Sequence, residues 1–127
     1  MRRYVLFICM LMLLTGTASG QTVPPDLVEA IRNGDAKAMS EYFHQSLEIS
    51  ILEKDHMASK NQATRIMEDF FKAHPPTAFS ISFEGAKVDS KYAIGALTTK
   101  DASFRMNIFF MLKEEKRLVY YLSIEKE

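Results

Sequence analysis

The last quarter of the chain constrains the fold most, because two runs there place apolar residues at every second position. The first run extends from Phe104 to Leu112 and the second from Leu118 to Ile124. This period of two is typical of β-strands with one buried face. With residues 113–117 as the connecting loop, the two runs predict an antiparallel β-hairpin.

Antiparallel pairing across that loop fixes which residues face one another. On the buried face the expected pairs are Leu112 with Leu118, Phe110 with Tyr120, Ile108 with Leu122 and Met106 with Ile124. On the other face they are Arg105 with Glu125, Asn107 with Ser123, Phe109 with Tyr121 and Met111 with Val119. A shift of one residue would lose these matches of charge and polarity, so the pattern favours this register.

The N-terminus has the three regions of a signal peptide. Arg2 and Arg3 supply positive charge, an apolar run covers residues 4–14, and small and polar residues follow up to Gly20. We expect cleavage before Gln21, although a site two residues earlier also fits. Because the apolar run is shorter than the ~20 residues of a membrane-spanning helix, residues 1–20 predict export to the periplasm or outside the cell.

Residues 21–127 are long enough for a single domain with one core. The only cysteine, Cys9, would leave with the signal peptide, so we expect neither a disulfide nor a thiolate metal site. His44, His56 and His74 lack the spacing that lets one helix present two metal ligands. Without Arg2 and Arg3, 14 basic residues stand against 16 acidic ones, and this balance of −2 argues against a nucleic-acid partner. We therefore expect no cofactor, no metal and no membrane insertion after cleavage.

Two short helices are expected after the signal peptide. Asp26 and Glu29 have the spacing of a capping box for the first helix. Asp35 is the expected N-cap of the second, whose apolar side includes Tyr42 and Phe43. Residues 47–51 then alternate as a short strand at a sheet edge, followed by a loop that contains Asp55 and His56.

The main helix is expected to begin after Ser59, which forms a capping box with Gln62. Proline at positions 75 and 76 ends the helix. Its apolar side consists of Ala63, Ile66, Met67, Phe70 and Phe71.

Two further strands, residues 79–84 and 92–99, precede the hairpin and complete a four-stranded meander. Gly95 inside the second of them suggests a bend or bulge. Two to three N-terminal helices on one face of a curved antiparallel sheet give the α+β class.

This order of elements resembles the nuclear transport factor 2-like cone, which is also the fold of ketosteroid isomerase and polyketide cyclases. Several segments are more specifically similar to a family of small exported bacterial proteins known as a domain of unknown function. They are 33–35 (Asn-Gly-Asp), 42–43 (Tyr-Phe), 59–63, 70–71 before 75–76, 92–95, 104–105 and 124–126. The resemblance implies the cone fold and export, and it provides no catalytic residues.

A cone-shaped sheet over helices can leave an apolar pocket at its open end. The bulky residues expected near such a pocket are Tyr42, Phe70, Tyr92, Phe110 and Tyr120. The alternative is that these side chains fill the core, as buried aromatic residues ordinarily do.

Two classes of function remain open. The first is a non-catalytic exported module that binds a partner protein or a small apolar ligand, because the inward face of the hairpin lacks acidic residues and histidine. The second is a small cofactor-free isomerase or dehydratase, with Asp55 or His56 as the base and Tyr120 as a hydrogen-bond donor.

The outer face of the hairpin predicts an interface, because its expected apolar residues form one patch. These residues are Phe109, Met111, Val119 and Tyr121. An exposed apolar patch of this kind usually marks an interaction surface, so we expect a homodimer.

Overall fold

A computed structural model describes residues 23–87 and 90–127 of the chain. Within these residues the helices are α2 (Pro25–Arg32), α3 (Ala36–Ser40) and α4 (Lys60–Ala73). The strands are β1 (Phe43–Ile51), β2 (Lys54–Ser59), β3 (Pro76–Ala86), β4 (Ser90–Thr99), β5 (Ser103–Lys113) and β6 (Lys116–Lys126). The predicted signal peptide lies outside the described residues.

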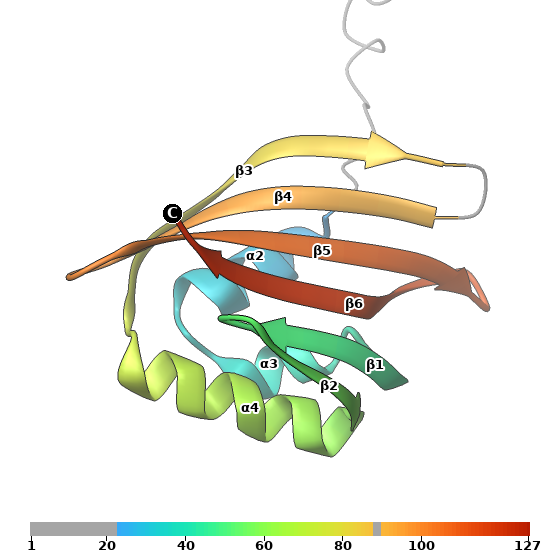
Figure 1. Ribbon diagram of the computed structural model, residues 1–127. Coiled ribbons are helices and arrows are strands. Elements are labelled where there is room, and N and C mark those ends of the chain that lie inside the picture. The colour runs from blue at the N-terminus through green and yellow to red at the C-terminus, as the bar shows by residue number, and fades with distance from the viewer. Residues whose placement is uncertain (1–22, 88–89) are drawn as a thin grey trace, which may run out of the picture.

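The strands form one six-stranded sheet in the order β2-β1-β6-β5-β4-β3. All neighbours are antiparallel except β1 and β6, which run parallel. Figure 1 shows the curved sheet with α2 and α3 behind it, while α4 lies beside β1 and β2. This arrangement confirms the predicted α+β class, with a sheet two strands wider than the expected meander.

The core lies between the helices and the face of the sheet that they cover. The buried residues of β5 and β6 on this face are Phe104, Met106, Ile108, Phe110, Val119, Leu122 and Ile124. They pack with the apolar sides of α2, α3 and α4 in one cluster. We call the opposite face of the sheet, which no described helix covers, the outer face.

Helix α4 forms as predicted because its first turn is capped from both directions. The hydroxyl of Ser59 accepts a hydrogen bond from the Gln62 amide (3.2 Å), and the Gln62 side chain accepts one from the Ser59 amide (3.0 Å). The helix ends at His74, just before the two prolines. Its buried residues are Ala63, Met67, Phe70 and Phe71, and Ile66 is partly buried.

The expected capping box of the first helix is wrong. Helix α2 begins at Pro25, and Pro24 at its N-cap makes no side-chain hydrogen bond. Proline suits this first position because its missing N–H would have no partner within the helix. The cap of α3 is confirmed, since the Asp35 carboxylate accepts a hydrogen bond from the Ala38 amide (3.0 Å).

The region between the helices differs more from expectation. Strand β1 is longer than predicted, because it begins at Phe43, which the sequence pattern places on a helix. It lies inside the sheet rather than at its edge, because it pairs with both β2 and β6. Asp55 and His56 belong to strand β2 rather than to a loop. The turn between these strands is formed by Leu52 and Glu53, both with positive φ (49° and 72°). Two consecutive residues with positive φ are typical of a two-residue hairpin turn, although Leu and Glu are not residue types that usually occupy one.

The register of the β5–β6 hairpin is confirmed from Arg105–Glu125 to Phe109–Tyr121. Beyond that point it shifts, so that Phe110 pairs with Val119 and Tyr120 has no direct partner. The cause is a two-residue turn at Glu114 and Glu115, shorter than the expected loop and again with positive φ at both residues. In place of the expected pairs, the structure therefore has Phe110 with Val119, Met111 with Leu118 and Leu112 with Arg117.

Gly95 allows a close packing contact rather than marking a bulge of its own strand. A Cβ atom at this position would lie 2.5 Å from the ring of Phe79 on β3. The irregularity is in the neighbouring strand, where the register shifts between Ile81 and Phe83. Among the described residues, no helix combines the length and the hydropathy needed to cross a membrane.

Candidate functional site

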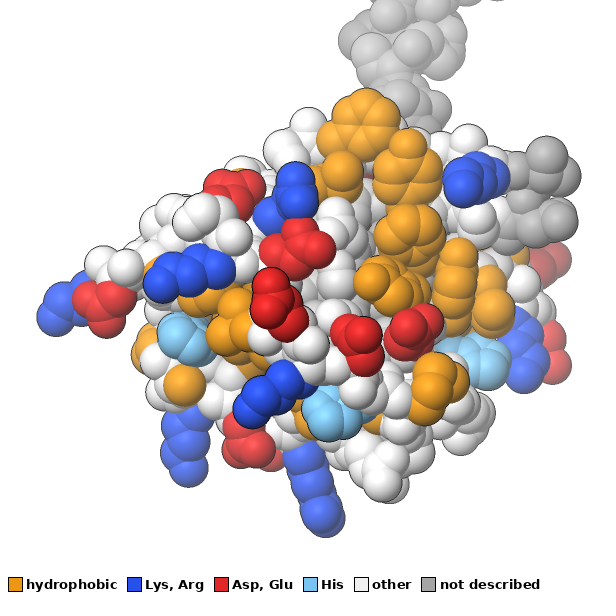
Figure 2. Space-filling model, in the orientation of Figure 1, with side chains coloured by type: hydrophobic (Ala, Val, Ile, Leu, Met, Phe, Trp, Pro, Cys, Tyr) orange, Lys and Arg blue, Asp and Glu red, His pale blue; other side chains and the backbone are white. Residues whose placement is uncertain are grey.

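The outer face carries a continuous row of aromatic side chains across four neighbouring strands. Strand pairing places Tyr92 beside Phe109 and Phe109 beside Tyr121. The ring centroids are 5.8 Å apart for Phe83–Tyr92, 5.5 Å for Tyr92–Phe109 and 5.4 Å for Phe109–Tyr121. We call Phe83, Tyr92, Phe109, Tyr120 and Tyr121 the aromatic row. Figure 2 shows hydrophobic side chains gathered over this part of the sheet.

The rings pack on one another in different geometries. Tyr92 and Phe109 are stacked with an interplanar angle of 21°, whereas Tyr121 meets Phe109 edge-on at 85°. Offset stacking and edge-to-face contacts are the favourable arrangements of aromatic pairs. A stacked pair covers one face of each ring, so the row offers ring edges and partly covered faces rather than a flat platform.

A glycine supports the row from the edge strand. Gly85 pairs with Tyr92, and a Cβ atom at this glycine would lie 2.3 Å from the Tyr92 ring. The absence of a side chain therefore allows the tyrosine ring to lie over the backbone of β3. Bulky aromatic residues often cover glycines in this way in curved sheets.

The bulge in β6 changes which residues face outward. Because Tyr120 is the extra residue of the bulge, its ring lies on the outer face, 6.2 Å from Phe109. Val119 points inward instead and is 1% exposed. The expectation that Tyr120 faces the core and Val119 the solvent is therefore wrong. Of the other proposed interface residues, Phe109, Tyr121 and Met111 alternate with the buried positions and are partly exposed.

Beyond the aromatic row, the line of cross-strand neighbours continues onto β1 and β2 with two residues that are not aromatic. Glu48 pairs with Tyr121, and Met57 pairs with Glu48. Met57 lies at one end of this line and is 72% exposed. Phe83 pairs with Ile94 on β4 rather than with Tyr92, lies on the opposite edge strand beside the Tyr92 ring, and is 52% exposed. The described outer face thus has its two most exposed large apolar side chains at its two edges.

A line of polar residues runs beside the aromatic row. The Ser50 hydroxyl donates to the Asp55 carboxylate (2.6 Å), and the Asn107 amide donates to the Ser123 hydroxyl (2.8 Å). Further along, Arg105 and Glu125 form an ion pair with an N···O distance of 2.6 Å. These cross-strand pairs satisfy the polar groups within the sheet surface.

A shallow recess of about 440 Å³ opens between the two lines. It is lined by Asn107, Phe109, Tyr120, Tyr121, Ser123 and Glu125. Its walls combine aromatic rings with hydrogen-bonding groups, which is typical of protein interfaces.

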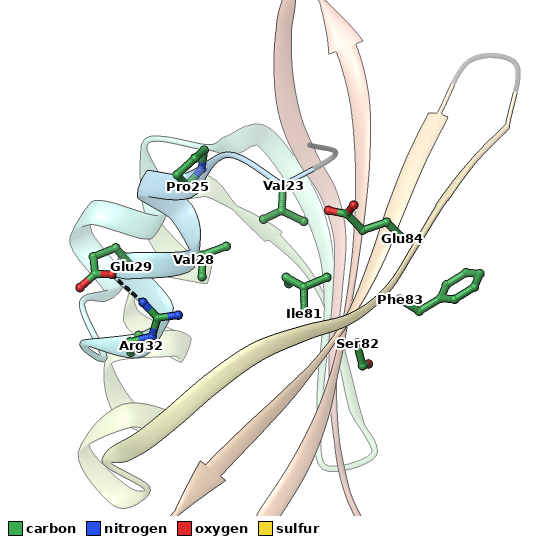
Figure 3. Close-up of a pocket in the computed structure, with 9 residues that line it drawn as sticks. All are labelled: Val23, Pro25, Val28, Glu29, Arg32, Ile81, Ser82, Phe83 and Glu84. Carbon is green, nitrogen blue, oxygen red and sulfur yellow. Dashed lines mark hydrogen bonds and ion pairs between the residues drawn. The ribbon is translucent and has the colours of Figure 1, made fainter. Parts of the chain in front are cut away.

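A second recess, of about 580 Å³, lies between α2 and the edge strand β3. Figure 3 shows Val23, Val28 and Ile81 lining the space between these elements, whereas Phe83 points away from α2. Arg32 is held at its rim by an ion pair with Glu29 (2.8 Å). The lining of this groove is therefore apolar in its centre and charged at its rim.

A third recess, of about 660 Å³, lies beside the β5–β6 turn and is partly lined by Tyr42 and Leu118. Burial, followed by the negative charges of Asp26 and Glu41, raises the pKa of Tyr42. Tyr42 therefore keeps its proton to higher pH than an ordinary tyrosine.

The five residues expected around one pocket lie at separate places. Phe70 and Phe110 fill the core, with exposed fractions of 5% and 1%. Tyr92 and Tyr120 lie on the outer face, and Tyr42 lines the recess beside the hairpin turn. The structure therefore does not bring these side chains together around a single cavity.

The residues of the suggested acid–base pair are also apart from a shared cavity. Asp55 is hydrogen-bonded to Ser50 on the surface of β2, and His56, the next residue of the strand, points to the opposite side. None of the recesses described above is lined by both Asp55 and Tyr120. In the described parts of the chain, no three His, Cys, Asp or Glu side chains are grouped to hold a metal ion.

Comparison with known proteins identifies the family of this chain. The profile of DUF4783, a domain of unknown function, matches residues 25–125. No curated protein matches the sequence.

Solved structures support the same assignment. A DUF4783 family protein from Bacteroides ovatus is 25% identical, with a TM-score of 0.81 over 85% of this chain and 98% of that one. One from Bacteroides uniformis is 28% identical, with a TM-score of 0.78 over 83% and 97%. An NTF-2-like protein of unknown function from Silicibacter pomeroyi is 16% identical and shares the fold, with a TM-score of 0.61 over 98% of both chains. With the nuclear transport factor 2-like fold and a family match over nearly all of its described residues, the chain belongs to the DUF4783 family.

Proposed function

We propose that this protein is an exported, non-catalytic module that binds a protein partner through the outer face of its sheet. The observation that carries the proposal is the aromatic row, which crosses β3 to β6 on the face that no described helix covers. The signal-peptide pattern of residues 1–20 is the reason for placing this function outside the cytoplasm.

The chemistry of the row suits a protein better than a flat ligand. Tyrosine and phenylalanine are enriched at interfaces because a large apolar area is ordered at low entropic cost. The stacked rings of Tyr92 and Phe109 cover each other, which leaves edges for a surface of complementary shape. The neighbouring polar line supplies the hydrogen-bonding rim that such an interface has.

Site-specific photo-cross-linking tests this proposal. A photoreactive phenylalanine analogue at Phe83 should give a cross-linked product in the native exported fraction, because Phe83 is half-exposed at the end of the row. Leu112 is a matched control, since it is also apolar and exposed (61%) but lies at the hairpin turn, away from the row. Products of equal yield from both positions, or none from Phe83, would contradict the proposal.

A small apolar ligand is the second candidate, favoured by the groove between α2 and β3. Its centre is formed by Val28 and Ile81, and its volume of about 580 Å³ falls in the range of ligand pockets. A fluorescent anilinonaphthalene probe should bind this groove and lose affinity in Val28→Asp. Unchanged binding in that variant, with the fold intact by circular dichroism, would remove this candidate.

A further inference from the structure

We infer that the groove between α2 and β3 binds an extended segment of another protein, which adds to β3 as a further strand and places a basic residue opposite Glu84. This inference goes beyond the outer-face proposal, because it concerns a different surface, and it gives the groove an occupant other than a small ligand. Three features carry it: a free strand edge, an apolar centre and one carboxylate without a counter-charge.

Strand β3 is a free edge of the sheet. It is the last strand in the order β2-β1-β6-β5-β4-β3 and pairs with β4 alone. Every second N–H and C=O group of such a strand points away from the sheet and can pair with a further strand. Arg32 closes this edge at one point, because its guanidinium donates to the Phe79 carbonyl (3.3 Å). Within the described residues no other side chain bonds to the backbone of β3, so the edge after Phe79 has no such cover.

The other edge of the sheet is less suited to a further strand. Strand β2 has six residues, and Lys54, Asp55 and His56 are among them. Short length and charged side chains are common protections of a sheet edge. Strand β3 has 11 residues, and Glu84 is the one charged residue among them. Of the two edges, β3 is therefore the one that can accept a partner strand.

The irregularity in β3 places Ile81 and Glu84 on the same side of the sheet. Ile81 pairs with Gly95 and Glu84 pairs with Ala93, so β3 has one extra residue between these two positions. Figure 3 shows both side chains on the side of β3 on which α2 lies, whereas Phe83 points away. Residues two apart in a strand share one face. On a regular strand added beside β3, the positions next to Ile81 and Glu84 would therefore be two residues apart.

The groove offers a different contact at each of these two positions. Beside Ile81 the lining is apolar and includes Val28 of α2. At Glu84 it is negative, since no cation in the described parts of the chain forms an ion pair with this carboxylate. Glu29 and Arg32 at the rim neutralise each other (2.8 Å). The groove is thus complementary to an apolar side chain and to a Lys or Arg two residues away from it.

An extended peptide is the occupant that uses all three features together. Strand addition gives affinity through main-chain hydrogen bonds, and pockets for alternate side chains give specificity. A small apolar ligand would contact the centre formed by Val28 and Ile81 and would use neither the strand edge nor the Glu84 carboxylate.

A labelled peptide with reversible charge tests this occupant. The probe is a peptide of about nine residues, a usual strand length, with alternating Thr and Val and with Lys in place of one Val. Fluorescence anisotropy should show that it binds the exported protein. A peptide with Glu instead of Lys should bind more than about fivefold more weakly, because like charges then meet at Glu84. Glu84→Lys should reverse this preference, and circular dichroism checks its fold.

Methylation of alternate peptide amides tests the strand pairing itself. The N–H groups of a strand point alternately to its two sides, so methyl groups on odd or on even amides block one side each. One of the two methylated peptides should lose binding and the other should keep it. Equal effects of the two patterns would overturn strand addition.

Glu68→Lys is the matched control, because Glu68 is an exposed glutamate of α4 outside the groove, and it should leave the charge preference unchanged. No binding of the Lys peptide at about 1 mM would overturn the inference, and an anilinonaphthalene probe that still binds would then favour a small ligand. Dissociation of a protein dimer by the peptide would instead assign the β3 edge to a second copy and overturn the partner named here. The cross-link from Phe83 tests the opposite face, so each proposal can fail without the other.

Discussion

Replacing Phe70 with alanine should lower the free energy of unfolding by about 3–5 kcal/mol, the range for a fully buried phenylalanine. Phe70 is 5% exposed and belongs to the core between α4 and the sheet. Its ring meets Phe104 edge-on at 5.3 Å and lies 5.0 Å from the ring of His74. The edge-to-face contact with Phe104 accounts for about 0.5–1.5 kcal/mol of the expected loss.

A second substitution at the same position separates the cost of losing the ring contacts from the cost of the cavity. Phe70→Leu retains most of the apolar volume and loses the ring contacts, so its cost should stay below about 1.5 kcal/mol. The difference between the two variants then measures the cavity left by alanine. Phe70→Leu also keeps the prediction testable if Phe70→Ala does not fold, because a loss of about 5 kcal/mol can unfold a domain of ordinary stability.

Urea unfolding followed by circular dichroism measures these values, and thermal melting gives a second reading. A loss of 3 kcal/mol corresponds to a fall in Tm of at least about 12 °C for a domain of this size. Leu112→Ala is the exposed control and should change stability by no more than about 0.5 kcal/mol. A loss below about 1 kcal/mol for Phe70→Ala would refute the placement of this ring in the core.

Three further predictions concern other parts of the molecule. Gly95→Ala should cost about 1–3 kcal/mol in chemical unfolding, because the new Cβ atom would collide with the Phe79 ring; a neutral effect would contradict this contact. The raised pKa of Tyr42 means that its stabilising contribution is complete below the ordinary tyrosine pKa of about 10 and is lost as the pH rises through the folded value. Tyr42→Phe should therefore weaken the loss of stability above about pH 10, and an unchanged alkaline profile would count against it. Mass spectrometry of the exported protein should find Gln21 at the N-terminus, whereas a product that retains Cys9 would exclude the predicted cleavage.

The sequence predicts those parts of the fold in which a local pattern decides the structure. The stripe of α4 and its cap at Ser59 are local, and so is the alternation of β5 and β6. The turns at Leu52–Glu53 and Glu114–Glu115 were missed because both use residues that rarely adopt positive φ. Once the second turn is shortened to two residues, the bulge at Tyr120 is needed to restore the register toward Glu125.

The candidate site could be predicted only in part, because it combines residues from distant segments. Phe109 and Tyr121 are paired by the hairpin itself, so their pattern was sufficient. Phe83 and Tyr92 join them through the pairing of β3 and β4, which depends on an irregularity near Ser82. The periodicity of one segment does not show how neighbouring strands align side by side, because that alignment depends on several strands at once.

The parallel pairing of β1 with β6 has a consequence for the order of folding. Strand β1 comes early in the chain, yet its neighbour β6 ends at Lys126. The β1–β2 hairpin is therefore joined to the meander only after nearly every residue of the domain is present. Contacts of such large sequence separation slow folding, because the closure of a long loop precedes the gain from pairing. A chain emerging from the ribosome would leave Leu47 and Ile49 of β1 without their sheet neighbour until β6 has also emerged, so this domain should complete its sheet only after that strand has been synthesised.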